Sequence, residues 1–374
     1  MTIAHTGGGS AGNEVLEVAR RAARVATSYP FKVWHFGDSV YLDSLIALAQ
    51  AGVADGPEFS GYAYGLLKGW AARASFGFED HTAPGAALVD TWGRTRDEQL
   101  LDAALQLAAL WDRFPRCATA EAYLHTSRVH RNVAIDCAHF DGPFLARLAG
   151  ATGENRYAEQ AVYELLWRLR LLQDEGTGLC HHSYDCGRGR RGGVLWGRGQ
   201  GWALLGAVET LKALPVAIDG RDEICRRLKT LLRALITFQD DSGHWHTVID
   251  DANSYLESSV AAFFIAGAVG AYELGLVPAA DVWPAVTRAW QALQRSLSSD
   301  GVLDGVSAET MTTLSPAAYR QVRTGGMYPW GQGPLVLAAL AVNRLPTDPA
   351  ASGIGTSSDP TSSHARLTDG RHKS

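Results

Sequence analysis

Hydrophobic residues along this chain recur mainly at three- and four-residue spacing, which is the period of an amphipathic helix. The pattern predicts helices over residues 14–28, 40–51, 61–74, 95–114, 132–149, 156–173, 201–213, 222–238, 256–275, 280–297 and 333–342. Alternating patterns typical of strands are few and short. We therefore expect an all-α fold.

A weak internal repeat runs through the body of the chain. In each copy an amphipathic helix ends in a polar turn with glycine, a short excursion follows, and another apolar helix begins; the copies cover residues 171–185, 235–251 and 293–309. The helices that follow are expected to begin near positions 196–202, 255–259 and 330–333, and an earlier one near Asp136. These openings recur at intervals of roughly 60 to 75 residues, which is typical of helical hairpins laid side by side.

Hairpins that bury each other's faces predict a closed α/α toroid, in which an inner ring of helices is surrounded by an outer ring. In such a toroid the inner helices all begin at the same end. Their N-termini would gather unpaired N–H groups and positive dipole ends at one mouth, which is a natural place for an anionic ligand.

One folded catalytic domain is expected over residues 13–345, between a flexible stretch at 1–12 and a tail at 346–374. The tail is rich in Pro, Gly, Ser and Thr and too poor in apolar groups to offset its ordering entropy, so we expect disorder there. A net charge of −5 without a basic cluster argues against nucleic acid and anionic membranes as partners. No apolar run reaches the length of about 18 residues that a membrane span needs.

The chain opens without a basic region followed by an apolar core, so no secretory signal is recognised. It contains five cysteines, and an odd number without such a signal favours reduced thiols. We therefore expect a cytoplasmic protein that is a monomer or a weak homo-oligomer.

Two aspartates stand out as candidate acid and base groups. Asp136 lies between apolar residues at the start of a predicted inner helix, where a carboxylate is costly to bury unless it is paired or protonated. Asp80 lies on a loop that precedes the turn marked by Pro84 and Gly85. The alternative for each aspartate is an ordinary helix cap. Asp141, which precedes a Gly-Pro pair, indicates local turn chemistry.

The segment GGVLWGRGQGWALLG (192–206) places Trp196, Arg198 and Trp202 among glycines. We expect these glycines to allow a sharp turn into an inner helix and a close approach to a ligand, so that the large side chains project into the mouth. Aromatic walls with polar neighbours suit sugars, which present flat C–H faces edged by hydroxyls. Ordinary core aromatics beside turns are the competing interpretation.

The sequence lacks the usual motifs for metal binding, for nucleotide binding and for a serine nucleophile. The segment CHHSYDC (180–186) has ligand types that zinc prefers but not their usual spacing, so we favour a substrate-facing His182 over a metal ligand. GRGQG is not a phosphate-binding loop, and neither Gly-x-Ser-x-Gly nor His-Glu-x-x-His occurs. We therefore expect no metal and no cofactor, and a carboxylate pair is the leading catalytic hypothesis.

Several of these segments together resemble the unsaturated glycuronyl hydrolases, glycoside hydrolase families 88 and 105, and the resemblance to family 105 is the stronger one. The matching segments, in order along residues 30 to 343, are DHTAPG (80–85), IDCAHFDGPFLARLAGATGE (135–154), TGLCHHSYD (177–185), WGRGQGW (196–202), YLESSVAAFFIAGAVGAYELGL (255–276) and WGQG (330–333). The tryptophan–glycine–arginine motif is fairly specific, whereas the aspartate at a helix start is not.

The resemblance implies an (α/α)6 barrel and removal of a 4,5-unsaturated uronic acid from the non-reducing end of oligosaccharides made by polysaccharide lyases. In these families an aspartic acid protonates C4 of the enol ether, water adds at C5, and the resulting hemiketal opens and releases the next sugar. The motifs assign the proton donor to Asp136 and a supporting role to Asp80. Substrate-binding positions of the families match His125, His182, Trp196, Arg198, Trp202 and Trp330.

The sequence departs from the family pattern at three positions. Thr126 follows the matched histidine where lysine is frequent, Tyr184 replaces a common tryptophan, and Asp38 stands where another polar residue is expected. These departures leave the second sugar undefined. A conventional inverting glycosidase that uses Asp136 and Asp80 as acid and base, and a non-catalytic helical or carbohydrate-binding protein, remain as alternatives.

Overall fold

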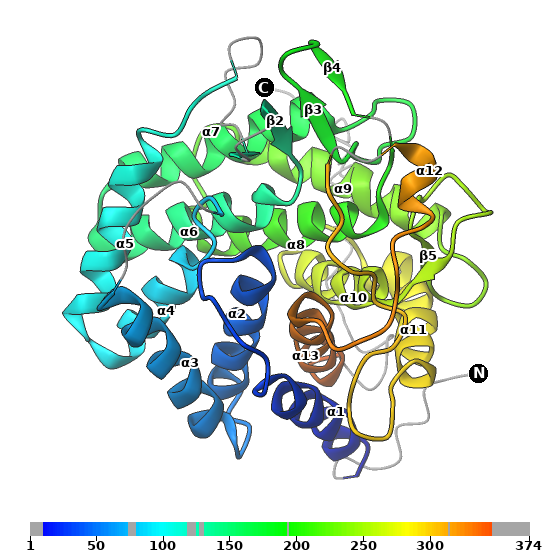
Figure 1. The fold of residues 1–374 in the computed structure, drawn as a ribbon, viewed down its shortest axis with the longest axis horizontal. Coiled ribbons are helices and arrows are strands. Elements are labelled where there is room, and N and C mark those ends of the chain that lie inside the picture. Colours follow the sequence, from blue (N-terminus) through cyan, green and yellow to red (C-terminus); the bar gives the residue numbers. More distant parts are fainter. Residues whose placement is uncertain are drawn as a thin grey trace, which may run out of the picture.

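Two concentric rings of helices make up the fold of the computed structural model (Figure 1), which describes residues 10–73, 80–117, 125–126, 131–192, 194–312 and 315–345. The inner ring consists of α2 (Phe36–Gln50), α4 (Gly85–Thr95), α6 (Cys137–Thr152), α8 (Gly197–Ala213), α10 (Ser258–Glu273) and α13 (Pro329–Asn343). The outer ring consists of α1 (Ser10–Ala26), α3 (Gly56–Ala71), α5 (Glu98–Trp111), α7 (Asn155–Leu172), α9 (Arg221–Thr237) and α11 (Ala279–Arg295).

Each inner helix packs against the next one, and α13 returns to α2, so the inner ring is closed. From α2 to α11, each inner helix also packs against the outer helix that follows it along the chain. Helix α1 packs against α13, so the two ends of the described chain complete the last hairpin (Figure 1). The fold is therefore an (α/α)6 barrel, and the predicted all-α toroid of hairpins is confirmed.

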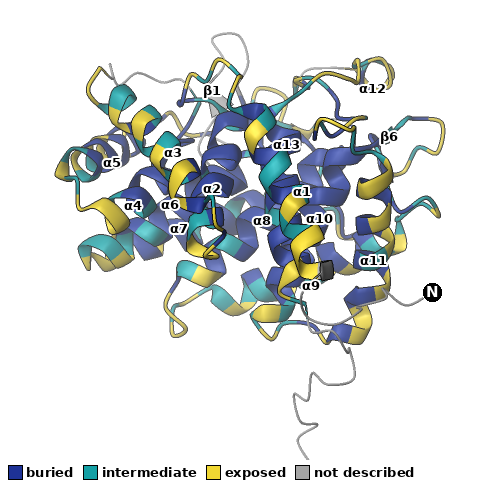
Figure 2. Cartoon of the chain, turned by 90° about the horizontal axis from the view of Figure 1, so that it is seen from below, coloured by how far each residue is buried: buried dark blue, intermediate teal, exposed yellow. Residues whose placement is uncertain are grey.

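Burial separates the two rings (Figure 2). The inner helix α10 has the sequence SSVAAFFIAGAVGAYE and is buried from Ser258 to Ala271, whereas the outer helix α9 has a charged outer face. Glycines bring the inner helices close together. A Cβ at Gly206 would lie 2.4 Å from the Ala138 carbonyl oxygen of α6, and one at Gly201 would lie 2.6 Å from Cβ of Phe263 on α10.

A glutamine in the first turn of two inner helices shows the internal repeat at atomic level. Gln200 accepts from the Cys180 N–H and donates to the Cys180 carbonyl. Gln332 in the same way accepts from the Leu303 N–H and donates to the Gly301 carbonyl. Each amide thus ties the excursion before an inner helix to the start of that helix, which fixes the loops at this end of the barrel.

Short strands lie at the same end of the barrel as the helix starts. A four-stranded antiparallel sheet has the order β1 (His125–Thr126), β2 (Arg131–Ala134), β3 (Ser183–Asp185) and β4 (Arg190–Arg191). A second pair is formed by β5 (Trp245–His246) and β6 (Leu256–Glu257). Figure 2 shows β1, β6 and the short helix α12 (Pro316–Tyr319) together at this end, which we call the mouth.

The predicted helix starts agree with the structure at α6, α8, α10 and α13. Residues 132–134 were expected to be helical but form part of β2, because their backbone pairs with β3. The boundary expected at residue 13 also differs, since α1 begins at Ser10. The proposed tail at 346–374 lies outside the described residues.

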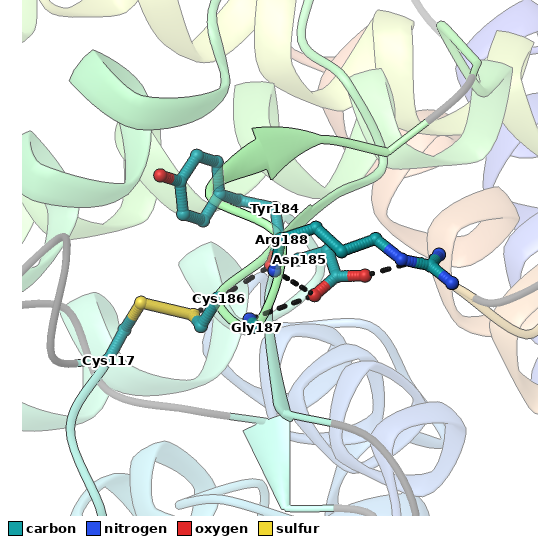
Figure 3. Close-up of a disulfide and its surroundings, with 6 residues drawn as sticks. All are labelled: Cys117, Tyr184, Asp185, Cys186, Gly187 and Arg188. Atoms are coloured by element: carbon teal, nitrogen blue, oxygen red, sulfur yellow. Dashed lines mark hydrogen bonds and ion pairs between the residues drawn. A yellow bond between two sulfur atoms is a disulfide. The ribbon is translucent and has the colours of Figure 1, made fainter.

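A disulfide joins Cys117, after α5, to Cys186 in the turn between β3 and β4 (Figure 3). The expectation of reduced thiols is therefore wrong for this pair, because the fold brings together two cysteines that are 69 residues apart. Asp185 orders the same turn by accepting hydrogen bonds from the Gly187 and Arg188 amides. No helix in the described part of the chain is long and apolar enough to cross a membrane.

Candidate active site at the mouth of the barrel

Residues at the starts of the inner helices contact residues of other segments at the mouth or beneath it. The Phe36 amide at the start of α2 donates to Oδ2 of Asp80 at 2.6 Å, and the Phe36 ring lies 5.0 Å from that of Trp330 at the start of α13. Arg198 of α8 pairs with Glu257, which directly precedes α10. The ring geometry thus gathers polar and aromatic groups from distant segments at one place, as the repeat predicted.

Asp136 occupies the N-cap position of α6, but its side chain makes no capping hydrogen bond. The side chain is 18% exposed. Its Oδ1 atom is buried and has no hydrogen-bond partner among the described residues. A carboxyl group that only capped the helix would accept from a backbone amide of the first turn. Asp136 therefore does not cap α6 through a hydrogen bond, although its place at the helix start still suits the alternative of a helix-dipole partner.

His182 lies beside Asp136 and is oriented by Tyr319 of α12. Its Nε2 atom is 3.7 Å from Oδ1 of Asp136, and its Nδ1 atom is 2.5 Å from the Tyr319 hydroxyl. Burial and the negative charge of Asp136 raise the pKa of Tyr319, so this phenol stays protonated. When Tyr319 donates to Nδ1, the second ring nitrogen carries its hydrogen toward Asp136.

Arg198 lies beneath the mouth and not in it. The side chain is fully buried, and its Nη1 atom is 3.1 Å from Oε1 of Glu257. The same guanidinium donates to the Ser307 hydroxyl at 2.6 Å and to the Ala308 carbonyl at 2.9 Å. The expectation that Arg198 projects into the mouth as a substrate-binding side chain is therefore wrong, because both of its terminal nitrogens already donate to protein acceptors.

Two tryptophans enclose this arginine. The guanidinium carbon lies 4.6 Å from the Trp196 ring centre and 5.9 Å from that of Trp330. Trp196 also contacts the His182 ring at 4.2 Å, whereas the Trp330 indole donates to the Ser307 carbonyl. Trp196 thus connects the buried ion pair to His182 beside Asp136, and Trp330 connects it to Phe36 at the start of α2.

Trp202 is a core residue in this structure. It is fully buried one turn into α8, with its ring 4.5 Å from Phe263 and 5.2 Å from His139. The expected projection into the mouth is therefore wrong for Trp202. The glycines around it also differ from expectation: Gly197 and Gly199 are helical and make room for neighbouring protein atoms.

Two other sequence-based assignments change. Asp38 is buried and accepts from the Lys32 and Val33 amides, which holds Val33 at a φ of 72° ahead of α2. Asp38 therefore orders a loop through Oδ2, and its buried Oδ1 atom lies 3.4 Å from Nδ1 of His35. His125 lies in β1, but its side chain is outside the described residues.

Glu257 and Tyr319 were missed by sequence reasoning. Glu257 is fully buried, caps α10 through the Val260 amide, and accepts from Ser259, Ser307 and Arg198. A glutamate directly before an apolar helix was a usable signal for a cap. Tyr319 lies 137 residues from its partner His182, and no local pattern marks it.

A family model agrees with this architecture. Residues 16–345 match the model of Glycosyl Hydrolase Family 88, so the chain belongs to that family. The assignment that the motifs suggested is thereby confirmed.

Two relatives match shorter stretches. The chain is 31% identical over 201 residues to the unsaturated rhamnogalacturonyl hydrolase YesR of Bacillus subtilis, covering 54% of this chain and 56% of that protein. It is 22% identical over 166 residues to an unsaturated 3S-rhamnoglycuronyl hydrolase of an Alteromonas species, covering 43% of this chain and 40% of that protein. The chain thus spans about half the length of these relatives.

Solved structures share the fold over almost their whole length. A possible member of family GH105 from Salmonella enterica superposes with a TM-score of 0.82 at 21% identity, covering 91% of this chain and 96% of that one. The unsaturated glucuronyl hydrolase of Bacillus sp. GL1 superposes with a TM-score of 0.71 at 17% identity, covering 89% and 97%. At these identities the structures support the barrel alone.

Proposed function

We propose that this protein removes a 4,5-unsaturated uronic acid from the non-reducing end of oligosaccharides produced by polysaccharide lyases. Membership of Glycosyl Hydrolase Family 88 supports glycoside hydrolysis. The two relatives, one a rhamnogalacturonyl and one a rhamnoglycuronyl hydrolase by name, both act on unsaturated substrates. The unsaturated uronyl group is therefore the substrate feature that the proposal takes from both of them.

The carboxyl of Asp136 is the observation that carries the proposal. It stands at a helix start without a capping hydrogen bond, and its buried Oδ1 atom has His182 as a neighbour. A group that protonates carbon must itself carry the proton when the substrate is bound. We assign to Asp136 the transfer of its proton to C4 of the unsaturated ring.

The remaining steps follow from that proton transfer. Positive charge develops at C5 and the ring oxygen, and the Asp136 carboxylate that has just formed can accept a proton from the water that adds at C5. The resulting hemiketal opens, and the glycosidic bond breaks as the second sugar leaves. Asp80 supports this step from the neighbouring helix start, where its Oδ2 is held by the Phe36 amide.

Direct sugar contacts are proposed for groups that line the same place. His182 and the aromatic pair Trp196 and Trp330 adjoin Asp136 or its neighbours, although both indoles are largely buried. Arg198 and Trp202 make no sugar contact in this proposal. They lie below the proposed binding residues and pack against the elements that carry them. His125 keeps its proposed binding role from the sequence motif.

The proposal also covers the ligand, the oligomeric state and the cellular location of the protein. We propose an unsaturated uronyl oligosaccharide as the only ligand, no metal or cofactor, and a monomer or weak homo-oligomer. A cytoplasmic location stays a prediction, and the Cys117–Cys186 bond weighs against it because disulfides persist mainly in oxidising compartments.

A panel of lyase-digested pectin, glycosaminoglycan, ulvan and gellan oligosaccharides tests the function. Hydration destroys the conjugated double bond, so we expect the ultraviolet absorbance of at least one digest to fall while a shorter sugar is released. Release of a sugar that keeps its absorbance would instead favour inverting displacement with Asp136 and Asp80 as acid and base. No release from any digest would favour a non-catalytic binding protein.

A further inference from the structure

Asp141 is a buried carboxylate whose contacts lie outside its own helix. It lies on α6, is 1% exposed, and makes three charged or hydrogen-bonded contacts to side chains of other elements. Its Oδ1 atom accepts from the Thr82 hydroxyl at 2.8 Å. Its Oδ2 atom lies 3.1 Å from Nδ1 of His81 and 2.9 Å from Nη2 of Arg168 on α7.

Two of the three partners of Asp141 directly follow Asp80 in the chain. His81 and Thr82 belong to the turn in which the Ala83 amide donates to the Asp80 carbonyl, and that turn leads into α4. Two of the three contacts of Asp141 are therefore made to side chains of the turn that begins at Asp80.

The turn is strained and needs such support. His81 has a φ of 50°, which is the left-handed region that residues other than glycine rarely adopt and that costs about 1–2 kcal/mol. Its side chain is held by Asp141, and its carbonyl accepts from the Trp34 indole at 2.9 Å. These contacts stabilise the left-handed backbone conformation of His81, which an isolated turn would rarely adopt.

Asp141 is also fixed relative to Asp136, and we call its contacts to His81 and Thr82 the clamp. Asp141 follows Asp136 by five residues on the same helix, a rise of about 7.5 Å along its axis. Because α6 is continuous between them, any group fixed to Asp141 is also fixed relative to Asp136. We propose, on the basis of the function proposed above, that Asp141 is a positioning residue that sets the place of Asp80 relative to Asp136 through Thr82 and His81.

A metal ion is a poorer explanation of the same cluster. His81, Cys137 and Asp141 lie close enough together to bind one. However, Arg168 already supplies the positive charge next to Asp141, and burial raises the pKa of the Cys137 thiol well above its usual range. A protonated thiol is a poor metal ligand, so the cluster works as an ion pair with hydrogen bonds.

Thr82→Val tests the clamp without burying an unpaired charge, because valine has the shape of threonine but no donor. We expect kcat to fall between about tenfold and a hundredfold with little change in KM, since a small misplacement of a catalytic group has that effect. Thr82→Ser keeps the hydroxyl and is expected to restore most of kcat. Thr91→Val on α4, the helix that follows this turn, is the matched control, because the buried Thr91 hydroxyl has no hydrogen-bond partner among the described residues.

Hydrogen exchange supplies a measurement that does not depend on activity. The Phe36 amide donates to Asp80, so release of the turn in Thr82→Val is expected to speed its exchange by about tenfold. Thr82→Ser and Thr91→Val are expected to exchange like the wild type. Unchanged exchange at Phe36 in Thr82→Val, or an equal loss of kcat in Thr91→Val, overturns the positioning role. A wild type that is inactive on every unsaturated substrate overturns the proposed function alone.

Discussion

Arg198 and Glu257 form an ion pair with no exposed surface, with 3.1 Å between Nη1 and Oε1. The pair joins the starts of α8 and α10, and both residues also bond to Ser307 in the segment that follows α11. It thereby fixes the floor of the mouth. Such a pair is sensitive to loss of one partner, because the other charge then stays buried without compensation.

Glu257→Gln is therefore expected to lower the free energy of unfolding by about 3–5 kcal/mol. Denaturant unfolding followed by fluorescence measures this change. Glu273→Gln, at the exposed far end of the same helix, removes an ion pair with Arg344 and is expected to cost at most about 1 kcal/mol. Equal effects of the two substitutions would contradict the role given to the buried pair.

Tyr319→Phe removes the hydroxyl that orients His182. We expect kcat to fall about tenfold, the equivalent of roughly 1.4 kcal/mol, because the imidazole loses its fixed hydrogen position beside Asp136. Steady-state kinetics on the substrate found in the panel measures the loss. Tyr62→Phe is the control, since its hydroxyl donates to the Thr27 carbonyl and has no contact with His182; a matching loss there would refute the assignment.

A charged network at the opposite end of the barrel makes stability depend on pH. Lys212 and Arg147 lower the pKa of Glu209, against its burial, from an ordinary value of 4.5 to about 2. A depressed carboxyl pKa stabilises the fold above the unfolded value, and this contribution is lost as pH falls from about 4.5 toward about 2. Burial raises the pKa of the neighbouring Asp90, which acts in the opposite direction.

We expect Glu209→Gln to lose on the order of 2 kcal/mol of stability at neutral pH and to match the wild type near pH 2, within about 1 kcal/mol. Chemical unfolding at a series of pH values gives both curves. A constant difference between the two proteins at all pH values would contradict the assignment of the pH dependence to Glu209.

The disulfide is expected to stabilise the sheet at the mouth. Closing a loop between residues 69 apart contributes about 4 kcal/mol in the chain-entropy model. Reduction, or Cys186→Ser, is thus expected to lower the thermal midpoint. Cys225→Ser, which removes a free cysteine, serves as the control. Free thiol titration of five cysteines in the unreduced protein would show instead that this bond does not form.

Periodicity predicted the architecture because an inner helix is apolar on all sides and an outer helix on one side only. The starts of α6, α8, α10 and α13 followed from the repeated turns before them. Residues 132–134 were assigned to a helix because their strand pairing depends on residues 183–185, which the local sequence does not reveal.

The candidate site was predictable only in part. Asp136 was found from its place at a helix start, which is a local signal. Asp141 was assigned to turn chemistry because its partners His81 and Arg168 lie 60 and 27 residues away. Arg198 was expected to bind the ligand, since its acceptors at 257 and 307–310 come together only when the ring closes. Residue types thus indicated candidate acid, base and binding groups. Which of these groups remain accessible depends on the closed ring of helices, which the local sequence does not reveal.

The reaction carried out in deuterated water tests the central claim most directly. If Asp136 protonates C4, the released uronic acid product carries one deuterium at C4, its ultraviolet absorbance is lost, and Asp136→Asn stops both changes while substrate binding remains. A released sugar that keeps its double bond and carries no deuterium, or an Asp136→Asn variant with wild-type turnover, would contradict the account.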